Sequence, residues 1–244
     1  PPALPPSRPP DLPTSRPPDL PTSRPPDLPT SRLAMRLAHI LVPCLLLVAA
    51  CRSAPPETLP LPPLSERTEQ WQAWRAAKDS LFRSPESPLL PAQQAGFETL
   101  DFFPYDPALA FAVTLAPALE RDTLRMATST GEPRDYIRFG TFSLPVGARR
   151  YQITAFQAIE TDLDRGQPLR LFIPFMDATS GRSTYAAGRY LDLDPTADGR
   201  YVLDFNYAYN PYCVYNPAYS CPLPPPENRL ALPVPAGEQS FDPS

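Results

Sequence analysis

The chain has 244 residues, of which 39 are proline and 9 are glycine, and its formal net charge is −4. This length allows one large domain or two small ones, but so much proline excludes packed structure along the whole chain. The acidic balance, without a block of basic residues, argues against nucleic-acid binding, which requires clustered lysine and arginine to neutralise phosphates. We therefore predict no nucleic-acid partner.

An octapeptide repeat begins the chain. Ser-Arg-Pro-Pro-Asp-Leu-Pro-Thr occurs three times, at residues 7–14, 15–22 and 23–30. One leucine per unit cannot bury enough apolar surface to fold, so the repeat predicts an extended, polyproline-like chain. It is a proline-rich ligand for an aromatic groove, a spacer, or a stretch that is not translated. We interpret residues 1–34 as disordered or untranslated, because Met35 offers a later start.

Residues 35–50 have the pattern of a secretory signal peptide. Met35 and Arg36 supply a short positive start, and residues 37–48 form an apolar run that is too short to span a membrane. The sequence Val-Ala-Ala-Cys at residues 48–51 resembles the lipobox of bacterial lipoproteins. That resemblance implies cleavage before Cys51 and attachment of fatty chains such as palmitate to its sulfur. The alternative is ordinary signal cleavage, which leaves a free cysteine.

A lipid on Cys51 would place the protein at a membrane surface outside the cytoplasm. Arg52 at the next position favours the outer membrane in a Gram-negative cell. Residues 51–64 contain five prolines and predict an extended tether. The expected membrane partner is therefore a bilayer that is bound through the lipid anchor.

The chain after residue 50 contains no histidine, since His39 lies in the signal peptide. This excludes histidine-dependent nucleophiles, acid–base groups and zinc sites. An enzyme would need carboxylate, tyrosine or metal–carboxylate chemistry, and we predict no cofactor and no metal. Cys213 and Cys221 are an even, closely spaced pair, which predicts a disulfide in an oxidising compartment. Half of a metal site and a reactive thiol are the alternatives.

Residues 65–244 are predicted to form a single globular domain. A helix is expected over residues 65–83, because four apolar side chains follow one stripe at helical spacing: Trp71, Trp74, Leu81 and Phe82. Short β-branched and aromatic runs predict strands at residues 111–115, 123–127, 136–142, 151–159 and 169–173. The fold class is mainly β (α+β), an antiparallel sandwich or barrel-like domain with an N-terminal α-helix.

Residues 188–206 predict a β-hairpin around the Asp198–Gly199 turn signal. Alternation at period two assigns the side chains to two faces. The apolar face would carry Leu191, Leu193, Leu203 and Phe205, and the hydrogen-bonding face Tyr190, Asp192, Asp204 and Asn206.

Four blocks in the second half of the chain, residues 177–185, 188–192, 204–213 and 220–228, resemble the signature of the bacterial and archaeal family called domain of unknown function 1684. Residues 87–89 and 103–107 are similar to its N-terminal half, and the resemblance spans residues 68–241. It implies a single domain that is often carried on secreted or lipid-anchored proteins. It implies no known activity.

Polar residues in these blocks are the candidate site. Asp177, Asp192, Asp204 or Glu227 would act as general acid/base or hold a cation, and Arg189 would stabilise an anionic group. The alternative is a buried ion-pair network that stabilises the fold. The candidate binding residues are Thr179, Ser180, Thr184, Tyr185, Asn206, Tyr209, Asn210 and Tyr212.

A second hypothesis concerns tyrosines. Five of the eleven tyrosines lie within residues 207–219, interleaved with asparagines. Aromatic faces and amide groups suit a sugar or peptide ligand, although these tyrosines would also serve simply to pack a long loop. The leading prediction is an exported, lipid-anchored envelope protein that acts as a binding or structural module for cell-wall glycan or peptide. A carboxylate- or metal-carboxylate-dependent hydrolase is the alternative, and whether the protein is an enzyme stays open.

Overall fold

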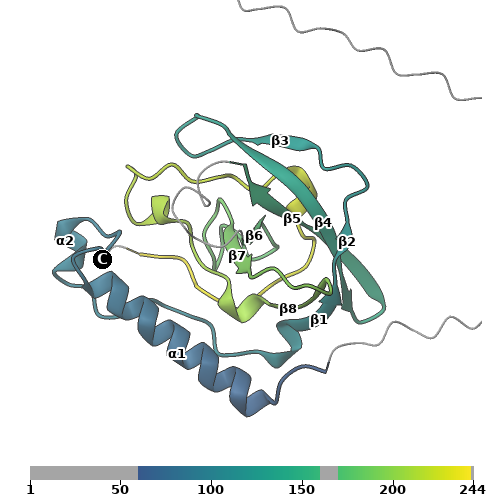
Figure 1. The fold of residues 1–244 in the computed structure, drawn as a ribbon. Helices are drawn as coiled ribbons and strands as arrows, with labels where there is room; N and C mark the ends of the chain where they lie inside the picture. Colours follow the sequence, from purple (N-terminus) through teal and green to yellow (C-terminus); the bar gives the residue numbers. More distant parts are fainter. Residues whose placement is uncertain (1–59, 160–169, 243–244) are drawn as a thin grey trace, which may run out of the picture. The chain divides into compact units, whose positions relative to one another are not determined.

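The computed structural model describes residues 60–159 and 170–242 (Figure 1). The predictions of the octapeptide repeat, the signal peptide, the lipidated Cys51 and most of the tether lie outside the described residues. Within the described part, no helix combines the length and the apolar character needed to cross a membrane.

The predicted helix is confirmed as α1, Leu64–Arg83. Pro63 occupies its N-cap position, and Trp71 and Phe82 are buried against an aromatic cluster that includes Phe102 and Tyr215. The predicted apolar stripe is wrong at Leu81, which is 36% exposed. A second helix, α2, spans Pro91–Gln94. The described residues also contain four 3-10 helices: η1 Pro107–Leu109, η2 Phe205–Tyr207, η3 Tyr212–Val214 and η4 Pro226–Asn228.

The larger sheet is antiparallel and has six strands. They are β2 Ala116–Pro117, β3 Thr123–Met126, β4 Arg134–Val146, β5 Arg149–Ala158, β6 Leu171–Phe175 and β7 Arg189–Leu193. The order is β2-β4-β5-β6-β7, and β3 also pairs with β4. The long β4–β5 hairpin closes at Gly147, whose φ of 58° lies in the left-handed region that glycine adopts readily.

The smaller sheet pairs β1, Ala110–Thr114, with β8, Arg200–Asp204. The predicted hairpin over residues 188–206 is therefore wrong: both strands exist, but β7 pairs with β6 and β8 pairs with β1. The Asp198–Gly199 turn forms, and the carbonyl of Gly199 accepts the N–H of Leu115. This turn carries the chain from one sheet to the other. The alternation of apolar and polar residues therefore predicted the two strands correctly but not the strands with which they pair.

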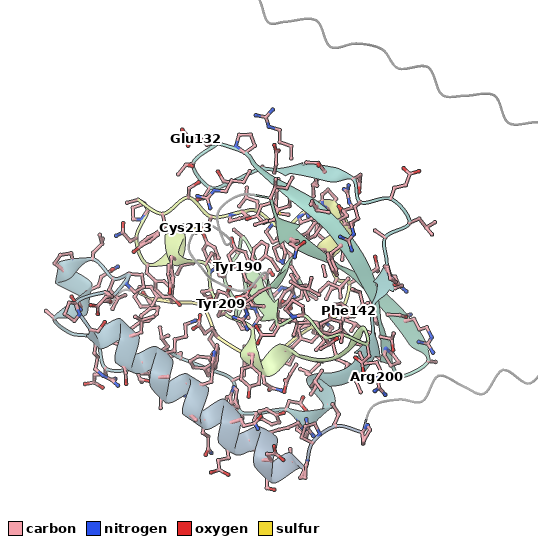
Figure 2. All side chains as sticks on the ribbon, in the orientation of Figure 1. Glu132, Phe142, Tyr190, Arg200, Tyr209 and Cys213 are labelled. Carbon is pink, nitrogen blue, oxygen red and sulfur yellow. The ribbon has the colours of Figure 1, made fainter. Side chains whose placement is uncertain are left out.

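The main apolar core contains residues from both sheets (Figure 2). Phe142 and Ile153 come from the large sheet, Leu203 comes from the small one, and Val234 belongs to the C-terminal segment. The aromatic cluster beneath α1 forms a second core. The expected mainly β, antiparallel α+β fold with an N-terminal helix is confirmed. One consequence for the site is that the predicted polar face of β7 and β8 is covered: Tyr190, Asp204 and Asn206 are buried.

Candidate ligand pocket

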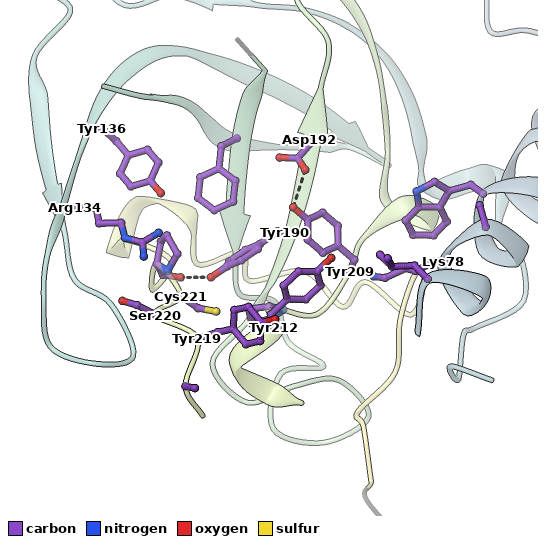
Figure 3. Close-up of a pocket in the computed structure, with 17 residues that line it drawn as sticks. Lys78, Arg134, Tyr136, Tyr190, Asp192, Tyr209, Tyr212, Tyr219, Ser220 and Cys221 are labelled. Carbon is purple, nitrogen blue, oxygen red and sulfur yellow. Dashed lines mark hydrogen bonds between the residues drawn. The ribbon is translucent and has the colours of Figure 1, made fainter. Parts of the chain in front are cut away.

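An open pocket of about 990 Å³ lies between α1, the β6–β7 edge and the loop that follows η2 (Figure 3). Figure 3 shows Lys78 at one end and Arg134 at the other, with tyrosine rings between them. The lining residues are Trp74, Ala77, Lys78, Leu81, Arg134, Tyr136, Phe172, Tyr190, Asp192, Tyr209, Pro211, Tyr212, Ala218, Tyr219, Ser220, Cys221 and Pro222.

The aromatic walls are built edge to face. The Tyr190 and Tyr209 rings lie 5.7 Å apart at 88°, and the Tyr212 and Tyr219 rings lie 5.3 Å apart at 66°. Such T-shaped pairs are the favoured geometry for aromatic contacts. The tyrosines therefore form the walls of a concave site and not a flat row of coplanar rings.

Two tyrosine hydroxyls in this wall are hydrogen-bonded to the protein. Tyr209 donates to Oδ2 of Asp192 at 2.7 Å, and Tyr190 donates to the carbonyl of Pro222. Burial raises the pKa of both phenols above the ordinary value, so they stay neutral donors at physiological pH. The Asp192 side chain is 27% exposed, lines the cavity and lies 3.9 Å from Nη1 of Arg170.

Lys78, the single lysine of the chain, is the cation at the α1 end. Its ammonium forms an ion pair with Glu238 and lies 5.5 Å from the Trp74 ring centroid and 4.8 Å from that of Tyr209. Burial lowers the pKa of Lys78, and Glu238 partly opposes this shift. Glu238 is completely buried. The ion pair therefore places a charged group next to the aromatic rings of the cavity wall.

The predicted residues around Arg189 form a separate, closed cluster. The guanidinium donates to Oδ2 of Asp177 at 3.0 Å and to the carbonyls of Val234, Ala236 and Glu238. Oδ1 of Asp177 accepts hydrogen bonds from the backbone N–H and hydroxyl of Thr179, and from the N–H of Val234. Two further candidates complete the cluster: the Thr184 hydroxyl meets that of Thr179, and Ser180 accepts the N–H of Asp177.

Asp204 and Asn206 form a third hydrogen-bonded cluster, beneath the N-terminal half of α1. Asp204 accepts the hydroxyl of Tyr105 at 2.8 Å and the N–H of Asn206 at 2.9 Å, which caps η2. The Asn206 side chain exchanges hydrogen bonds with the backbone of Asp106, and its carbonyl accepts the indole N–H of Trp71. These groups anchor α1 and the Tyr105 segment to β8.

The remaining candidates are also dispersed. Glu227 forms a surface ion pair with Arg138 at 2.9 Å. The backbone N–H of Asn210 donates to Glu238, and its side chain donates to the carbonyl of Gln239. The Tyr185 hydroxyl contacts the thiol of Cys213.

Of the predicted site residues, the pocket thus brings together Asp192, Tyr209, Tyr212 and Cys221. Sequence reasoning missed Lys78, Arg134 and Trp74. Two signals were available: Lys78 is the only lysine, and it follows Trp74 by four residues on the predicted helix, so both share one face. No local pattern connects them with the tyrosines, which lie more than fifty residues away in the sequence.

The structure does not support the predicted disulfide, because Cys213 and Cys221 are both free thiols. They are nevertheless neighbours, since the N–H of Cys213 donates to Sγ of Cys221 at 3.1 Å. The two sulfurs are hydrogen-bond partners and not a bonded pair. Across residues 60–159 and 170–242, no group of three or more cysteine, aspartate or glutamate side chains has an arrangement that would hold a metal ion.

Comparison with known proteins gives a family match and similarity to a solved structure. The family model described as "Protein of unknown function (DUF1684)" matches residues 95–239. The solution NMR structure of an uncharacterized protein of Haloarcula marismortui is similar, with 32% sequence identity and a TM-score of 0.55. The similarity covers 72% of this chain and 97% of that one. No curated protein matches the sequence.

Proposed function

The chain belongs to the DUF1684 family, whose members are described as proteins of unknown function, so we propose a function from the pocket itself. The protein is a binding module of the cell envelope. It binds a cell-wall glycan fragment between α1 and the tyrosine wall. The observation that carries this proposal is the convergence of aromatic rings and a few charged groups in one open cavity. Its volume of about 990 Å³ is at the upper end of the range for small-molecule sites.

A sugar matches the chemistry of this cavity. Tyrosine and tryptophan present an apolar ring face beside a polar group, which suits a ligand with apolar C–H faces and hydroxyls at its edges. Asp192 offers carboxylate oxygens as acceptors, and Arg134 offers guanidinium donors at the opposite end. A ligand lying between them would meet donors and acceptors at both ends and rings along its length.

Binding is favoured over hydrolysis by the positions of the carboxylates. Most glycoside hydrolases place two carboxylates on either side of the bond they cleave. Among the described lining residues, Asp192 is the one carboxylate. The other candidates, Asp177, Asp204 and Glu227, are each engaged in hydrogen bonds or ion pairs outside the pocket.

The cellular location is proposed from the sequence pattern alone. The apolar run at residues 37–48 and the lipobox-like residues 48–51 support export and lipid attachment at Cys51. Intact-mass measurement of protein purified from its native membrane tests this proposal. A chain that begins at Cys51 and carries fatty acids is expected, and retention of the residues before Cys51 would contradict it.

Ligand binding is tested by thermal shift and by tryptophan fluorescence with purified cell-wall glycan fragments. A ligand that binds only the folded state at one hundred times its Kd raises the free energy of unfolding by about 2.7 kcal/mol. Peptide fragments from the same cell wall form the second arm. Stabilisation by peptides alone would assign the pocket to a peptide ligand.

A matched pair of tryptophans localises the binding. Trp74 lines the pocket, whereas Trp71 packs beneath α1 and donates to the carbonyl of Asn206. Trp74→Phe is expected to weaken glycan binding about tenfold, the equivalent of one aromatic contact of about 1.4 kcal/mol. Trp71→Phe is expected to lower stability and leave the affinity unchanged. Equal glycan affinities in the two variants would show that the ligand does not bind in this pocket.

A further inference from the structure

Cys221 lines the pocket, and Cys213 lies beside it in the same segment of the chain. Cys213 belongs to η3, and Cys221 precedes the bridge between Pro222 and Thr128. Ser129 holds the second cysteine on both sides: its N–H donates to the carbonyl of Cys221 at 2.8 Å, and its hydroxyl accepts the N–H of Cys221 at 3.0 Å. The backbone therefore keeps the two thiols next to each other before any covalent bond forms.

The two thiols differ in their surroundings. Cys221 is buried and borders the pocket, whereas Cys213 is partly exposed. The Cys221 thiol and the Tyr185 hydroxyl are hydrogen-bond donors next to the Cys213 sulfur. These two donors stabilise a thiolate at Cys213.

The charge state of the pair follows from these contacts. The hydrogen bond from Cys221, together with that from Tyr185, lowers the pKa of Cys213 to about 6. The same thiol–thiol hydrogen bond and burial raise the pKa of Cys221. An accessible thiolate beside a protonated partner is the arrangement of an attacking and a resolving cysteine.

We propose that Cys213 and Cys221 form a dithiol site that undergoes thiol–disulfide exchange with low-molecular-weight disulfides, with Cys213 attacking and Cys221 resolving. The Cys213 thiolate attacks one sulfur of the disulfide RSSR, a Cys213–S–S–R bond forms, and RS⁻ leaves. Cys221 then loses its proton and attacks Sγ of Cys213, and the second RS⁻ leaves. The two cysteines lose two protons and two electrons, and the small disulfide is reduced to two thiols.

This site is distinct from a structural disulfide. A structural bond in a secreted protein resists the glutathione pool, whereas an exchanging pair opens and closes with it. The free thiols of the structure are the reduced form, and the Cys213–Cys221 bond is the oxidised form. Cys213 is partly exposed, so a small disulfide can reach the attacking sulfur from solvent.

The first test measures the rate of alkylation by iodoacetamide against pH, resolved by peptide mass spectrometry in the full chain with Cys44 and Cys51 replaced by serine. Since only the thiolate reacts, the rate at Cys213 is expected to rise with pH around a midpoint near 6, the pKa given above. Cys221 is expected to react only at alkaline pH. A Cys213 midpoint near 8.5, the ordinary thiol value, would overturn the proposal.

The second test traps the intermediate with oxidised glutathione at neutral pH. C221S is expected to hold one glutathione on Cys213, and C213S to react at Cys221 about tenfold more slowly, because an ordinary thiol is mostly protonated there. The protein with both cysteines is expected to lose two hydrogens and keep no glutathione. Equal rates in the two variants, a stable adduct in the intact pair, or a disulfide that survives reduced glutathione would each overturn it.

Tyr185→Phe separates this chemistry from a packing role. The variant keeps the ring and both cysteines but removes one donor to the Cys213 sulfur, so the alkylation midpoint should shift to higher pH. Circular dichroism of each variant verifies the fold. If the Cys213 alkylation midpoint is near pH 8.5 in the wild type and does not change in folded Tyr185→Phe, then Cys213 is not an activated thiol and the proposal is wrong.

Discussion

Two buried cations contact the same C-terminal segment and differ in what surrounds them. The Arg189 side chain is 0% exposed, and both of its terminal nitrogens donate to protein oxygens on Asp177 and the Val234–Glu238 backbone. The Lys78 ammonium forms one ion pair, with Glu238, and otherwise faces aromatic rings at the pocket. One cation is enclosed by hydrogen-bond acceptors, and the other borders a cavity.

The contrast distinguishes a cation held by several protein oxygens from one that is held by a single carboxylate and aromatic rings. Asp177 and Arg189 are two of the five catalytic candidates that the sequence offered, but their hydrogen bonds tie β7 to the C-terminal segment. Gly188, immediately before Arg189, has a φ of 97°, and a Cβ there would collide with the carbonyl of Phe175. The backbone at Gly188 and the side chains of Asp177 and Arg189 therefore serve to stabilise the fold.

Arg189→Met is expected to have the largest effect. It leaves the Asp177 carboxylate and three backbone carbonyls buried without their cation, and breaking one side of a buried ion pair lowers the free energy of unfolding by about 4 kcal/mol. Urea unfolding followed by circular dichroism measures the loss. The double variant R189M/D177N removes the stranded charge and should recover part of it.

A loss below about 1 kcal/mol in Arg189→Met, the value typical of exposed ion pairs, would mean that water reaches the cluster. The distinction between the closed cluster and the open pocket would then disappear.

Lys78→Met is expected to cost somewhat less, about 3 kcal/mol in the free energy of unfolding. The methionine side chain keeps the apolar contacts with Trp74 and Phe82, while Glu238 loses its cation but retains the hydroxyl of Tyr215 and the N–H of Asn210. Adding Glu238→Gln removes the stranded charge and should restore stability. If the double variant is no more stable than Lys78→Met, the ion pair is not the source of the loss.

The elements of the fold were predictable where their determinants are local. The helix over residues 64–83 follows from the spacing of its tryptophans and Phe82, and the strands follow from alternation in short runs. The partners of β7 and β8 were not predictable in this way. Leu191 lies opposite Ile173 and Leu203 opposite Phe111, and a turn with Asp-Gly chemistry suits a sheet-to-sheet connection as well as a hairpin.

The candidate site was predictable only in part for the same reason. The sequence shows which residues are polar, but not which of them already have partners. Asp192 and Asp204 occupy similar positions in similar strands, yet Asp192 borders the pocket while Asp204 is covered by Tyr105 and caps η2. Lys78 contacts Tyr209 and Glu238, which lie more than a hundred residues later in the sequence. No periodic pattern in the sequence predicts contacts over such a separation.

The smallest expected effects come from a pair of neutral hydroxyls, one in each region. Thr179→Val removes the hydroxyl that donates to Asp177 at 2.6 Å inside the closed cluster, and water cannot replace it, so a loss of about 2 kcal/mol in the free energy of unfolding is expected. Tyr209→Phe removes the hydroxyl that donates to Asp192 at 2.7 Å. Since Asp192 borders an open pocket, water can take its place, and a loss of about 0.5 kcal/mol is expected. Equal losses, measured by urea unfolding of the two variants side by side, would show that solvent has no better access to the pocket wall than to the Arg189 cluster.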